Sequence, residues 1–358
     1  MKIAFFHFSF DGAGGVERFL SVWANEFVSK GHEVYFISIN HCGQFVYDLN
    51  PQVKLIDLGF PMKRLTILKP LLIRKINKVI GKYGIDVTIA QSIKASYILG
   101  WAAQKYPICA VGMEHLGFDC ELHGSKHRAL RKKFYPFLKG FVTLTPDDEQ
   151  SYRSLGVSQV NTIFNPVITP AHHQHHSDSK ILLAIGRQDH QKNFPALLRV
   201  FKSLNRADLI LRIVGKDYGT RQSLIDQAKV LNIDEKIEFV DFQADVSNFY
   251  YSSSVFLLTS IYEGLPLVLI ESKAHGLPCI SYDCPTGPRH IINDGIDGFL
   301  VPMHDESLMA QRILAYLDNH GLQQLMSQAG VDDVAQRFSV PVLYKQWELF
   351  LQQLIQKR

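Results

Sequence analysis

The feature that most constrains the fold of this chain is a repeated alternation between short apolar runs and longer segments with helical periodicity. Apolar runs rich in β-branched and aromatic residues occupy 2–8, 33–39, 87–91, 108–112 and 140–145 of the first half, and a helical pattern covers 16–30. Runs of this length predict buried parallel strands, and the segments between them predict crossover helices. The first half is therefore expected to be a doubly wound α/β domain.

The same alternation restarts in the second half, after a stretch without apolar residues. Strands are expected at 181–185, 209–214, 237–240, 255–258 and 279–282, and helices at 306–316, 322–336 and 340–356. We interpret the polar stretch, His172-His173-Gln174-His175-His176-Ser177, as a linker, with a metal site as the alternative. A chain of 358 residues is long enough for two cores, so we expect domains at 1–168 and 169–338, divided near 166–178.

Cysteine usage and hydropathy suggest a cellular compartment. The five cysteines form no C-x-x-C pair, and such an odd set fits a reducing compartment, for which the cytoplasm is the natural expectation. The apolar opening run is interrupted by His7 and ends at Asp11, and no uncharged apolar stretch reaches about 18 residues. We therefore expect a chain that is neither exported nor inserted in a membrane by a helix.

The charge is divided unequally between the two halves. Residues 1–165 hold 20 Lys and Arg against 13 Asp and Glu, whereas 166–358 hold 18 against 21. Much of the excess falls in two basic, partly amphipathic helical stretches. They contain Lys63, Arg64, Lys69, Arg74, Lys75, Lys78 and Lys82, and then Lys126, Arg128, Arg131, Lys132 and Lys133. Such stretches indicate attraction to an anionic membrane surface or a phosphorylated lipid substrate; the alternatives are a solvated helix face and nucleic acid.

The segment from Glu263 to Glu271 places a turn and an apolar run between two carboxylates. The expected strand at 255–258 leads into it, Gly264 turns the chain, and 267–274 continue as a buried helix. Glu263 then lies at the carboxyl end of a parallel strand, and the helix start offers N–H groups to a diphosphate. Glu271, inside the helix, is placed to accept two sugar hydroxyls. The alternative is that Glu263 caps the helix and Glu271 is a solvated helix residue.

A glycine-rich turn follows the first expected strand and opens the first expected helix. Its sequence runs from Asp11 to Glu17 and includes Gly14 and Gly15, which permit a phosphate or sugar to approach the backbone closely. The spacing is not that of the dinucleotide fingerprint, and Asn40 stands where a ribose-binding acid would end the second strand.

Two cations lie in the corresponding loop of the second half, where Gly186 to Asn193 follow a strand. Arg187 and Lys192 are suited to neutralise the charge that a departing nucleoside diphosphate gains. The alternative is a pair of surface cations. No D-x-D motif is visible near any expected strand end, so we expect the cations and a helix end, without a metal ion, to stabilise the leaving group.

Five segments, taken in order, now form a recognisable set: Gly14-Gly15, Glu114-His115, 186–193, 263–271 and the glycine run 293–301. Together they resemble the retaining GT-B glycosyltransferases of family 4, the group 1 glycosyl transferases. Residues 283–289 further resemble the branch that builds bacterial lipopolysaccharide, capsule and lipid-linked oligosaccharides. Many relatives carry a glutamate where His290 stands, so the loop from Cys284 to His290 departs from the family pattern.

This resemblance implies two Rossmann-like domains facing a cleft, with an acceptor-binding first domain, a nucleotide-sugar-binding second domain and a last helix, 339–358, that crosses back to the first. The donor-binding residues that it implies are Gly14, Gly15, Gly186, Arg187, Lys192, Gly264, Leu265 and Glu271. Glu271 would hold the ribose and Glu263 the donor sugar. His115 matches the family's histidine near the reacting carbon, so His115 and Glu263 are the expected catalytic residues.

The resemblance also implies a reaction. A sugar moves from a nucleotide diphosphate sugar, most readily a UDP-sugar, to a hydroxyl of a growing cell-surface or lipid-linked saccharide, with retention of configuration, no cofactor and no metal. The enzyme would be cytoplasmic and peripheral at the inner face of the cell membrane. Two other enzymes share parts of this plan, a sugar-nucleotide epimerase of GT-B fold and a dinucleotide-dependent oxidoreductase. A non-catalytic scaffold that binds a membrane or a partner is a third alternative.

Overall fold

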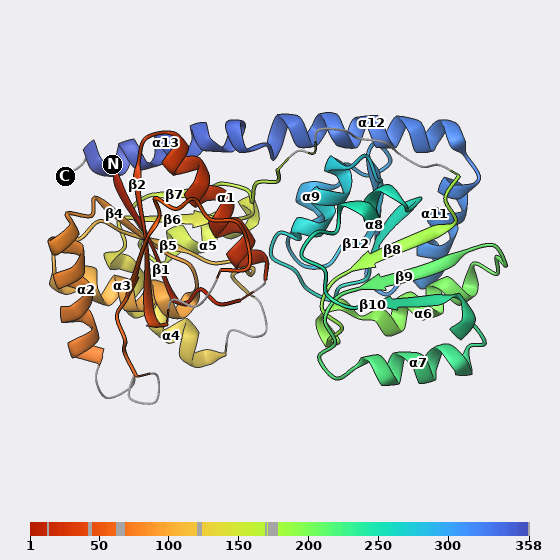
Figure 1. Cartoon of the computed structure of the whole chain (residues 1–358), viewed down its shortest axis with the longest axis horizontal. Helices are drawn as coiled ribbons and strands as arrows, with labels where there is room; N and C mark the ends of the chain where they lie inside the picture. The colour runs from red at the N-terminus through yellow and green to blue at the C-terminus, as the bar shows by residue number, and fades with distance from the viewer. Residues whose placement is uncertain are drawn as a thin grey trace. The chain divides into compact units, whose positions relative to one another are not determined.

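The computed structural model describes residues 1–12, 14–41, 45–61, 69–119, 124–168, 170 and 178–356. They form two compact units, which are considered separately (Figure 1). The first unit is Met1–Pro166 together with Val340–Arg358, and the second is Val167–Ser339. The chain thus returns to the first unit for its last helix.

The first unit is built on a parallel sheet, which has seven strands in the described residues, in the order β3-β2-β1-β4-β5-β6-β7. The strands are β1 (Lys2–Ser9), β2 (Glu33–His41), β3 (Lys54–Asp57), β4 (Val87–Ala90), β5 (Ala110–Met113), β6 (Gly140–Thr143) and β7 (Val160–Thr162). The chain runs outward on one side through β2 and returns to the other side of β1 at β4. This change of direction is the place where open parallel sheets bind ligands, beyond the carboxyl ends of their strands.

Helices cover both faces of this sheet. On one face α1 (Gly15–Ser29) packs beside α13 (Val340–Gln356), as Figure 1 shows, and the buried rings of Trp23 and Trp347 lie 5.8 Å apart. The last helix also covers β6, where a Cβ on Gly140 would come within 2.8 Å of the Phe350 ring. On the other face lie α2 (Lys69–Tyr83), α3 (Ile93–Lys105) and α4 (Ser125–Phe134), followed by the short η2 (Tyr135–Phe137), with α5 (Pro146–Ser154) packed next to them.

The second unit repeats the plan with a parallel sheet of six strands in the described residues, in the order β10-β9-β8-β11-β12-β13. The strands are β8 (Ile181–Ile185), β9 (Ile210–Val214), β10 (Ile237–Val240), β11 (Val255–Leu258), β12 (Cys279–Tyr282) and β13 (Gly298–Val301). Here the order changes direction between β8 and β11. The loops that follow these two strands carry the cation run and the first glutamate of the two-glutamate segment.

The helices of the second unit complete two layers around that sheet. One layer consists of α6 (Phe194–Ser203), α7 (Arg221–Val230) and α11 (Glu306–Leu317), whose apolar faces share one core. The opposite face is covered by α8 (Ser247–Tyr251) and α9 (Leu267–Ala274), and α12 (His320–Arg337) packs along α9. Short turns η3 (His190–Lys192), η4 (Asp234–Lys236) and α10 (Pro288–Ile291) connect these elements. In the described part of the chain, no helix is both long and apolar enough to span a bilayer.

Candidate active site

The loop between β8 and α6 is shaped by close backbone contacts and by left-handed residues. A Cβ on Gly186 would lie 2.7 Å from Cε of Lys192, so a glycine is needed where the lysine stem crosses the loop. Gly215, at the end of β9 with φ of 150°, lies against the carbonyl of Gly186 in the same way. Asn193 adopts the left-handed conformation with φ of 51° and leads into α6. The sequence therefore directs Lys192 back across the carboxyl end of β8.

Lys192 and Glu263 meet at this edge of the sheet. Lys192 Nζ lies 2.7 Å from Glu263 Oε1, and the two side chains are only 12% and 8% exposed. Gln191 supports the pair, because its Nε2 donates to the Tyr262 carbonyl at 3.0 Å and lies 3.5 Å from Glu263 Oε2. A buried carboxylate loses its hydration and needs a cationic partner, and Lys192 is that partner for Glu263. The simple capping interpretation of Glu263 leaves this ion pair unexplained.

Arg187 occupies the outer part of the same loop. Its guanidinium donates to Gln191 Oε1 at 2.8 Å and pairs with Asp189 at 3.1 Å, while half of the side chain, 55%, stays exposed. Its guanidinium also lies 5.8 Å from the ring centre of Tyr218. Arg187 is thus oriented by two neighbours and still open to a ligand from solvent.

Glu271 lies in the second turn of α9 and is buried, with 3% of its surface exposed. Tyr250 on α8 donates its hydroxyl to Glu271 Oε2 at 3.0 Å, and His275 Nδ1 lies 2.7 Å from the Glu271 carbonyl. The alternative that Glu271 is a solvated helix residue is wrong, because α8 covers it. Gly264 and Leu265 lie between the two glutamates in the turn that precedes α9, and both are buried.

The first unit holds the remaining predicted residues. Gly14 is the N-cap of α1, and Gly15 is its first residue. Glu17 turns back over this helix start and accepts a hydrogen bond from the Gly14 N–H at 3.0 Å. A Cβ on Gly12 would collide with the Glu17 carboxylate at 2.4 Å. Gly12 thus leaves room for the Glu17 carboxylate over the helix start, and one backbone donor of the helix start already has a partner.

His115 follows β5 and lies near the beginning of α1. Its Nε2 is 3.0 Å from Gln91 Oε1 at the end of β4, and its ring meets Phe19 of α1 edge to face at 5.0 Å. Burial lowers its pKa to about 3, and the proximity of His7 contributes. Burial likewise lowers the pKa of His7, on β1, to about 4. Both imidazoles are therefore neutral at physiological pH, and His115 is suited to hydrogen bonding rather than to acting as a cation.

The residue before His115 anchors this loop through a buried ion pair. Glu114 pairs with Arg131 of α4 and accepts a hydrogen bond from the Tyr135 hydroxyl. Arg131 also donates to the carbonyl of Phe118 at 2.7 Å, and both charged side chains are almost fully buried.

The assignment of Arg131 to a basic surface stretch is therefore wrong. Lys126, Arg128, Lys132 and Lys133 of the same helix are exposed. Of the other stretch, Lys63 and Arg64 lie outside the described residues.

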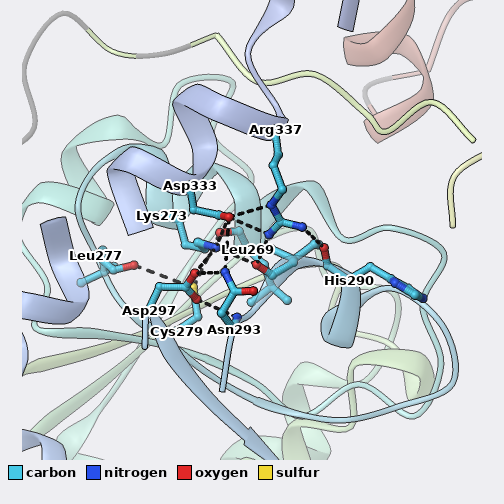
Figure 2. Close-up of polar contacts among 10 residues, drawn as sticks. Leu269, Lys273, Leu277, Cys279, His290, Asn293, Asp297, Asp333 and Arg337 are labelled. Atoms are coloured by element: carbon cyan, nitrogen blue, oxygen red, sulfur yellow. Dashed lines mark hydrogen bonds and ion pairs between the residues drawn. The ribbon is translucent and has the colours of Figure 1, made fainter. Parts of the chain in front are cut away.

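A second buried cluster supports α9 in the second unit (Figure 2). Lys273 has no exposed side-chain surface and contacts Asp297 at 2.8 Å and Asp333 at 2.6 Å. Arg337 of α12 also pairs with Asp333, at 2.6 Å. Burial alone would raise the pKa of Asp333, but the hydrogen bonds from Arg337 and Lys273 lower it. Lys273 stands two residues beyond Glu271, so the cluster fixes the helix that carries Glu271.

The structure thus places Gly186, Arg187, Lys192, Glu263, Gly264, Leu265 and Glu271 in the second unit, and Gly14, Gly15 and His115 in the first. It adds supporting residues that the sequence reasoning did not select. Gln191 lies inside the quoted cation run but carries no charge, and Tyr250 precedes Glu271 by 21 positions without a motif. Gln91 ends an expected strand, and this position at a strand end could have identified it as a candidate site residue. Among the described residues, no group of three or more His, Cys, Asp or Glu side chains is arranged to hold a metal ion.

Two family models match this chain in sequence. Residues 168–332 match the glycosyl transferases group 1 model, and residues 13–170 match glycosyltransferase family 4. Together the two models cover residues 13–332, so the chain belongs to the glycosyltransferases. Because both models describe glycosyltransferases, the epimerase and oxidoreductase alternatives have no support.

The relatives of this glycosyltransferase include enzymes of bacterial glycan synthesis. The amylovoran biosynthesis glycosyltransferase AmsD of Erwinia amylovora is 26% identical over 94% of this chain and 95% of its own length. An alpha-1,4-N-acetyl-D-galactosaminyltransferase of Campylobacter jejuni, whose name specifies a PP-undecaprenol-linked saccharide, is 28% identical over 97% of both chains. The lipopolysaccharide core glycosyltransferase LpsD of Rhizobium meliloti is 25% identical over 95% of this chain and 94% of its own.

Solved structures establish the fold. The apo lipopolysaccharide outer core galactosyltransferase WaaB superposes with a TM-score of 0.79, 19% identity and 99% coverage of both chains. The HepE protein of Anabaena in complex with UDP gives 0.83, with 18% identity and coverage of 99% of this chain and 100% of its own. The glycosyltransferase therefore has the GT-B fold, with two parallel sheets flanked by helices.

Proposed function

We propose that this glycosyltransferase moves a sugar from a UDP-sugar to a hydroxyl of a lipid-linked or cell-surface saccharide, with retention of configuration and without a metal ion. The observation that carries the proposal is the buried Lys192–Glu263 ion pair, which lies at the switch point of the second sheet beside the exposed guanidinium of Arg187. Cations and a carboxylate at this position are suited to a diphosphate and to the hydroxyls of the sugar attached to it.

Each predicted site residue of the second unit has one role in donor binding. Arg187 and Lys192 bind the diphosphate, the turn at Gly264 and Leu265 offers backbone groups to the phosphates, and Glu271 accepts the ribose hydroxyls. Lysine has three donors, so Lys192 can keep its contact with Glu263 while it binds phosphate. As the bond to the sugar breaks, negative charge develops on the diphosphate, and fixed cations stabilise it without reorganisation of water. No metal ion is needed for this stabilisation.

In the proposed reaction, the acceptor hydroxyl attacks on the face that the leaving diphosphate vacates. The bond between the anomeric carbon and the phosphate oxygen breaks, the bond to the acceptor oxygen forms, and the diphosphate takes the acceptor proton. Glu263 orients the donor sugar and no residue attacks the carbon, in contrast to retaining glycosidases with two close carboxylates. In the first unit, neutral His115 offers a hydrogen-bonding group, and the turn at Gly14 and Gly15 allows close approach to its backbone.

We further propose that the first unit binds the acceptor and that its basic helices attract an anionic membrane surface at the inner face of the cell membrane. Arg74, Lys78 and Lys82 of α2 and Lys126, Arg128, Lys132 and Lys133 of α4 are exposed, and both helices pack against α3 on one face of the sheet. Each basic residue near an anionic bilayer contributes about 1 kcal/mol of attraction. The lipid-linked acceptor named for the Campylobacter relative is consistent with this surface.

The proposal is tested by a thermal-shift screen of UDP-sugars and GDP-sugars, followed by mass spectrometry of products formed on lipid-diphosphate saccharides. We expect a UDP-sugar to raise the melting temperature and to be transferred, with the configuration of the product retained in its NMR spectrum and the rate unchanged by EDTA. Glu263→Gln should lower turnover by about 100-fold or more while the protein stays folded. A wild-type protein that neither binds nor transfers any of these sugars, or a Glu263→Gln variant with normal turnover, would refute the assignment.

A further inference from the structure

The loop after β12 contains two consecutive residues with positive φ, 61° at Thr286 and 62° at Gly287. Glycine adopts this region freely, whereas a β-branched residue there is a conformational outlier. Such a residue persists only where surrounding contacts hold it, and such residues cluster at functional sites. The contacts of Thr286 therefore indicate what its unusual backbone serves.

Both residues are pressed against the turn that carries the first glutamate. The Thr286 hydroxyl donates a hydrogen bond to the backbone carbonyl of Glu263. A Cβ on Gly287 would lie 2.6 Å from the Gly264 carbonyl oxygen and 2.6 Å from Cδ of Pro266. Only glycine allows this approach, so the loop after β12 and the turn after β11 are fitted to each other.

Glu263 is consequently held from two directions. Its carboxylate is fixed by Lys192 and Gln191, which belong to the loop between β8 and α6. Its backbone is fixed from the side of β12 by Thr286. Cys284, in the same loop, is fully buried, and burial together with the charge of Glu263 raises the pKa of its thiol. The described contacts of Thr286 do not reach Arg187 or Glu271, the residues assigned to the nucleotide.

We propose that Thr286 is a positioning residue that fixes the backbone of Glu263, so that its carboxylate is directed at the donor sugar and not at the nucleotide. The inference rests on the proposed function and adds a role for the loop from Cys284 to His290. The strained backbone of Thr286 is maintained because it brings the hydroxyl to the Glu263 carbonyl. A displacement of about 1 Å in such an orienting group is enough to cost about 100-fold in activity.

The test compares Thr286→Val, which keeps the shape and removes the hydroxyl, with Thr286→Ser, which keeps the hydroxyl. Calorimetric titrations use UDP and a panel of UDP-glucose, UDP-galactose, UDP-N-acetylglucosamine and UDP-N-acetylgalactosamine. We expect Thr286→Val to bind UDP within about threefold of wild type and to bind the preferred UDP-sugar about 10- to 100-fold more weakly, the loss expected for a hydrogen bond to a charged group. Thr286→Ser should match wild type for both ligands.

Thr286→Gly serves as a second variant, because glycine accepts the left-handed backbone and folds without the hydroxyl; it should show the same selective loss. Ser179→Ala is the matched control, since Ser179 also donates its hydroxyl to a carbonyl, that of Ser252 at 2.6 Å, before the amino end of β8. Normal UDP-sugar affinity in both Thr286→Val and Thr286→Gly, or an equal loss for UDP and UDP-sugar, would overturn the inference alone. A wild-type protein that binds neither UDP nor any UDP-sugar of the panel would instead contradict the proposed function.

Discussion

At the scale of single residues, the site is defined by which charged side chains are buried and paired. The Lys192 and Glu263 side chains are nearly buried and satisfy each other, while Arg187 remains half exposed beside them. In the first unit, the neighbouring histidines at the sheet edge, His7 and His115, are neutral because burial lowers the pKa of both. The predicted site residues of the two units therefore differ in chemistry, with charged side chains in the second unit and neutral imidazoles in the first.

The two histidines predict an acid-sensitive first unit. Their native pKa values, about 3 for His115 and about 4 for His7, lie below the value near 6.5 of an unfolded histidine. As the pH falls below 6.5 the unfolded chain binds protons that the native imidazoles do not, so the free energy of unfolding decreases until the native groups titrate. At pH 5 we expect a loss of about 2 kcal/mol for each histidine, relative to pH 7.5.

Urea unfolding at pH 7.5 and pH 5.0 measures this effect. The loss of stability between the two pH values should be about 2 kcal/mol smaller in His115→Gln than in wild type. His320→Gln, at an exposed position on α12, should behave as wild type. An equal loss in wild type and His115→Gln would show that His115 is not buried as a neutral group.

A site residue could be predicted from the sequence only when it belongs to a local sequence pattern. Glu263, Lys192 and the glycines stand in short runs next to strands, so the periodicity of the chain places them at strand ends. Tyr250 and Thr286 reach the glutamates only through tertiary packing. Their contacts depend on the position of α8 and on a left-handed backbone, neither of which a single sequence specifies.

At the scale of elements, α9 joins the donor site to the interior of the second unit. It buries Glu271 toward α8, and the Lys273 cluster with Asp297, Asp333 and Arg337 anchors it against α12 (Figure 2). A buried ammonium with two carboxylate partners is balanced only as a set, because each desolvated charge needs its counterpart. The cluster therefore gives α9 a fixed position that apolar packing alone would specify less sharply.

Lys273→Met should consequently lower the free energy of unfolding of the second unit by about 3–5 kcal/mol, because Asp297 is left buried without its cation. Urea denaturation measures the change, and the double variant Lys273→Met with Asp297→Asn should recover part of it. Lys229→Met, at an exposed position on α7, is the matched control and should change stability by less than about 0.5 kcal/mol. A Lys273→Met effect as small as that of the control would mean that the cluster does not anchor α9.

Element boundaries were predictable where burial imposes a clear pattern. The expected strands at 181–185, 237–240, 255–258 and 279–282, and the helices at 267–274 and 340–356, are confirmed at both ends. The strands β3 and β7 were not predicted from the sequence. They are four and three residues long and lie at the edges of the first sheet. β3 is largely exposed, so it has no apolar run that would mark it. The strand β13 was not predicted either, and it lies inside the glycine run 293–301.

At the scale of the whole molecule, two doubly wound units carry different surfaces. The first contains the basic helices α2 and α4, and the second contains the proposed donor site. The charge excess of 1–165 was readable from the sequence, but which cations are exposed was not: Arg131 is buried with Glu114, while its neighbours Lys132 and Lys133 face solvent. Charge on this surface would raise the local concentration of an enzyme at an anionic bilayer.

Flotation with vesicles tests the proposed membrane surface. Wild type should bind vesicles that contain anionic phospholipid, bind neutral phosphatidylcholine vesicles weakly, and dissociate as salt screens the charges. Replacing Lys78, Lys132 and Lys133 by glutamine should weaken binding at least tenfold, since each contributes about 1 kcal/mol. A control with the same change of charge replaces Lys202, Lys229 and Lys345, which are also exposed. Equal effects of the two triple variants would refute a specific basic surface.

The central claim is that the second unit binds the diphosphate of a UDP-sugar through Arg187 and Lys192. Calorimetric titration of UDP into wild type, Arg187→Ala and the control Arg212→Ala tests it most directly, since Arg212 is a cation of β9 paired with Glu238 at 2.6 Å. We predict one site in wild type, about 10- to 100-fold weaker binding in Arg187→Ala, as the loss of a charge-assisted contact implies, and unchanged affinity in Arg212→Ala. Equal affinity of wild type and Arg187→Ala for UDP would contradict the claim.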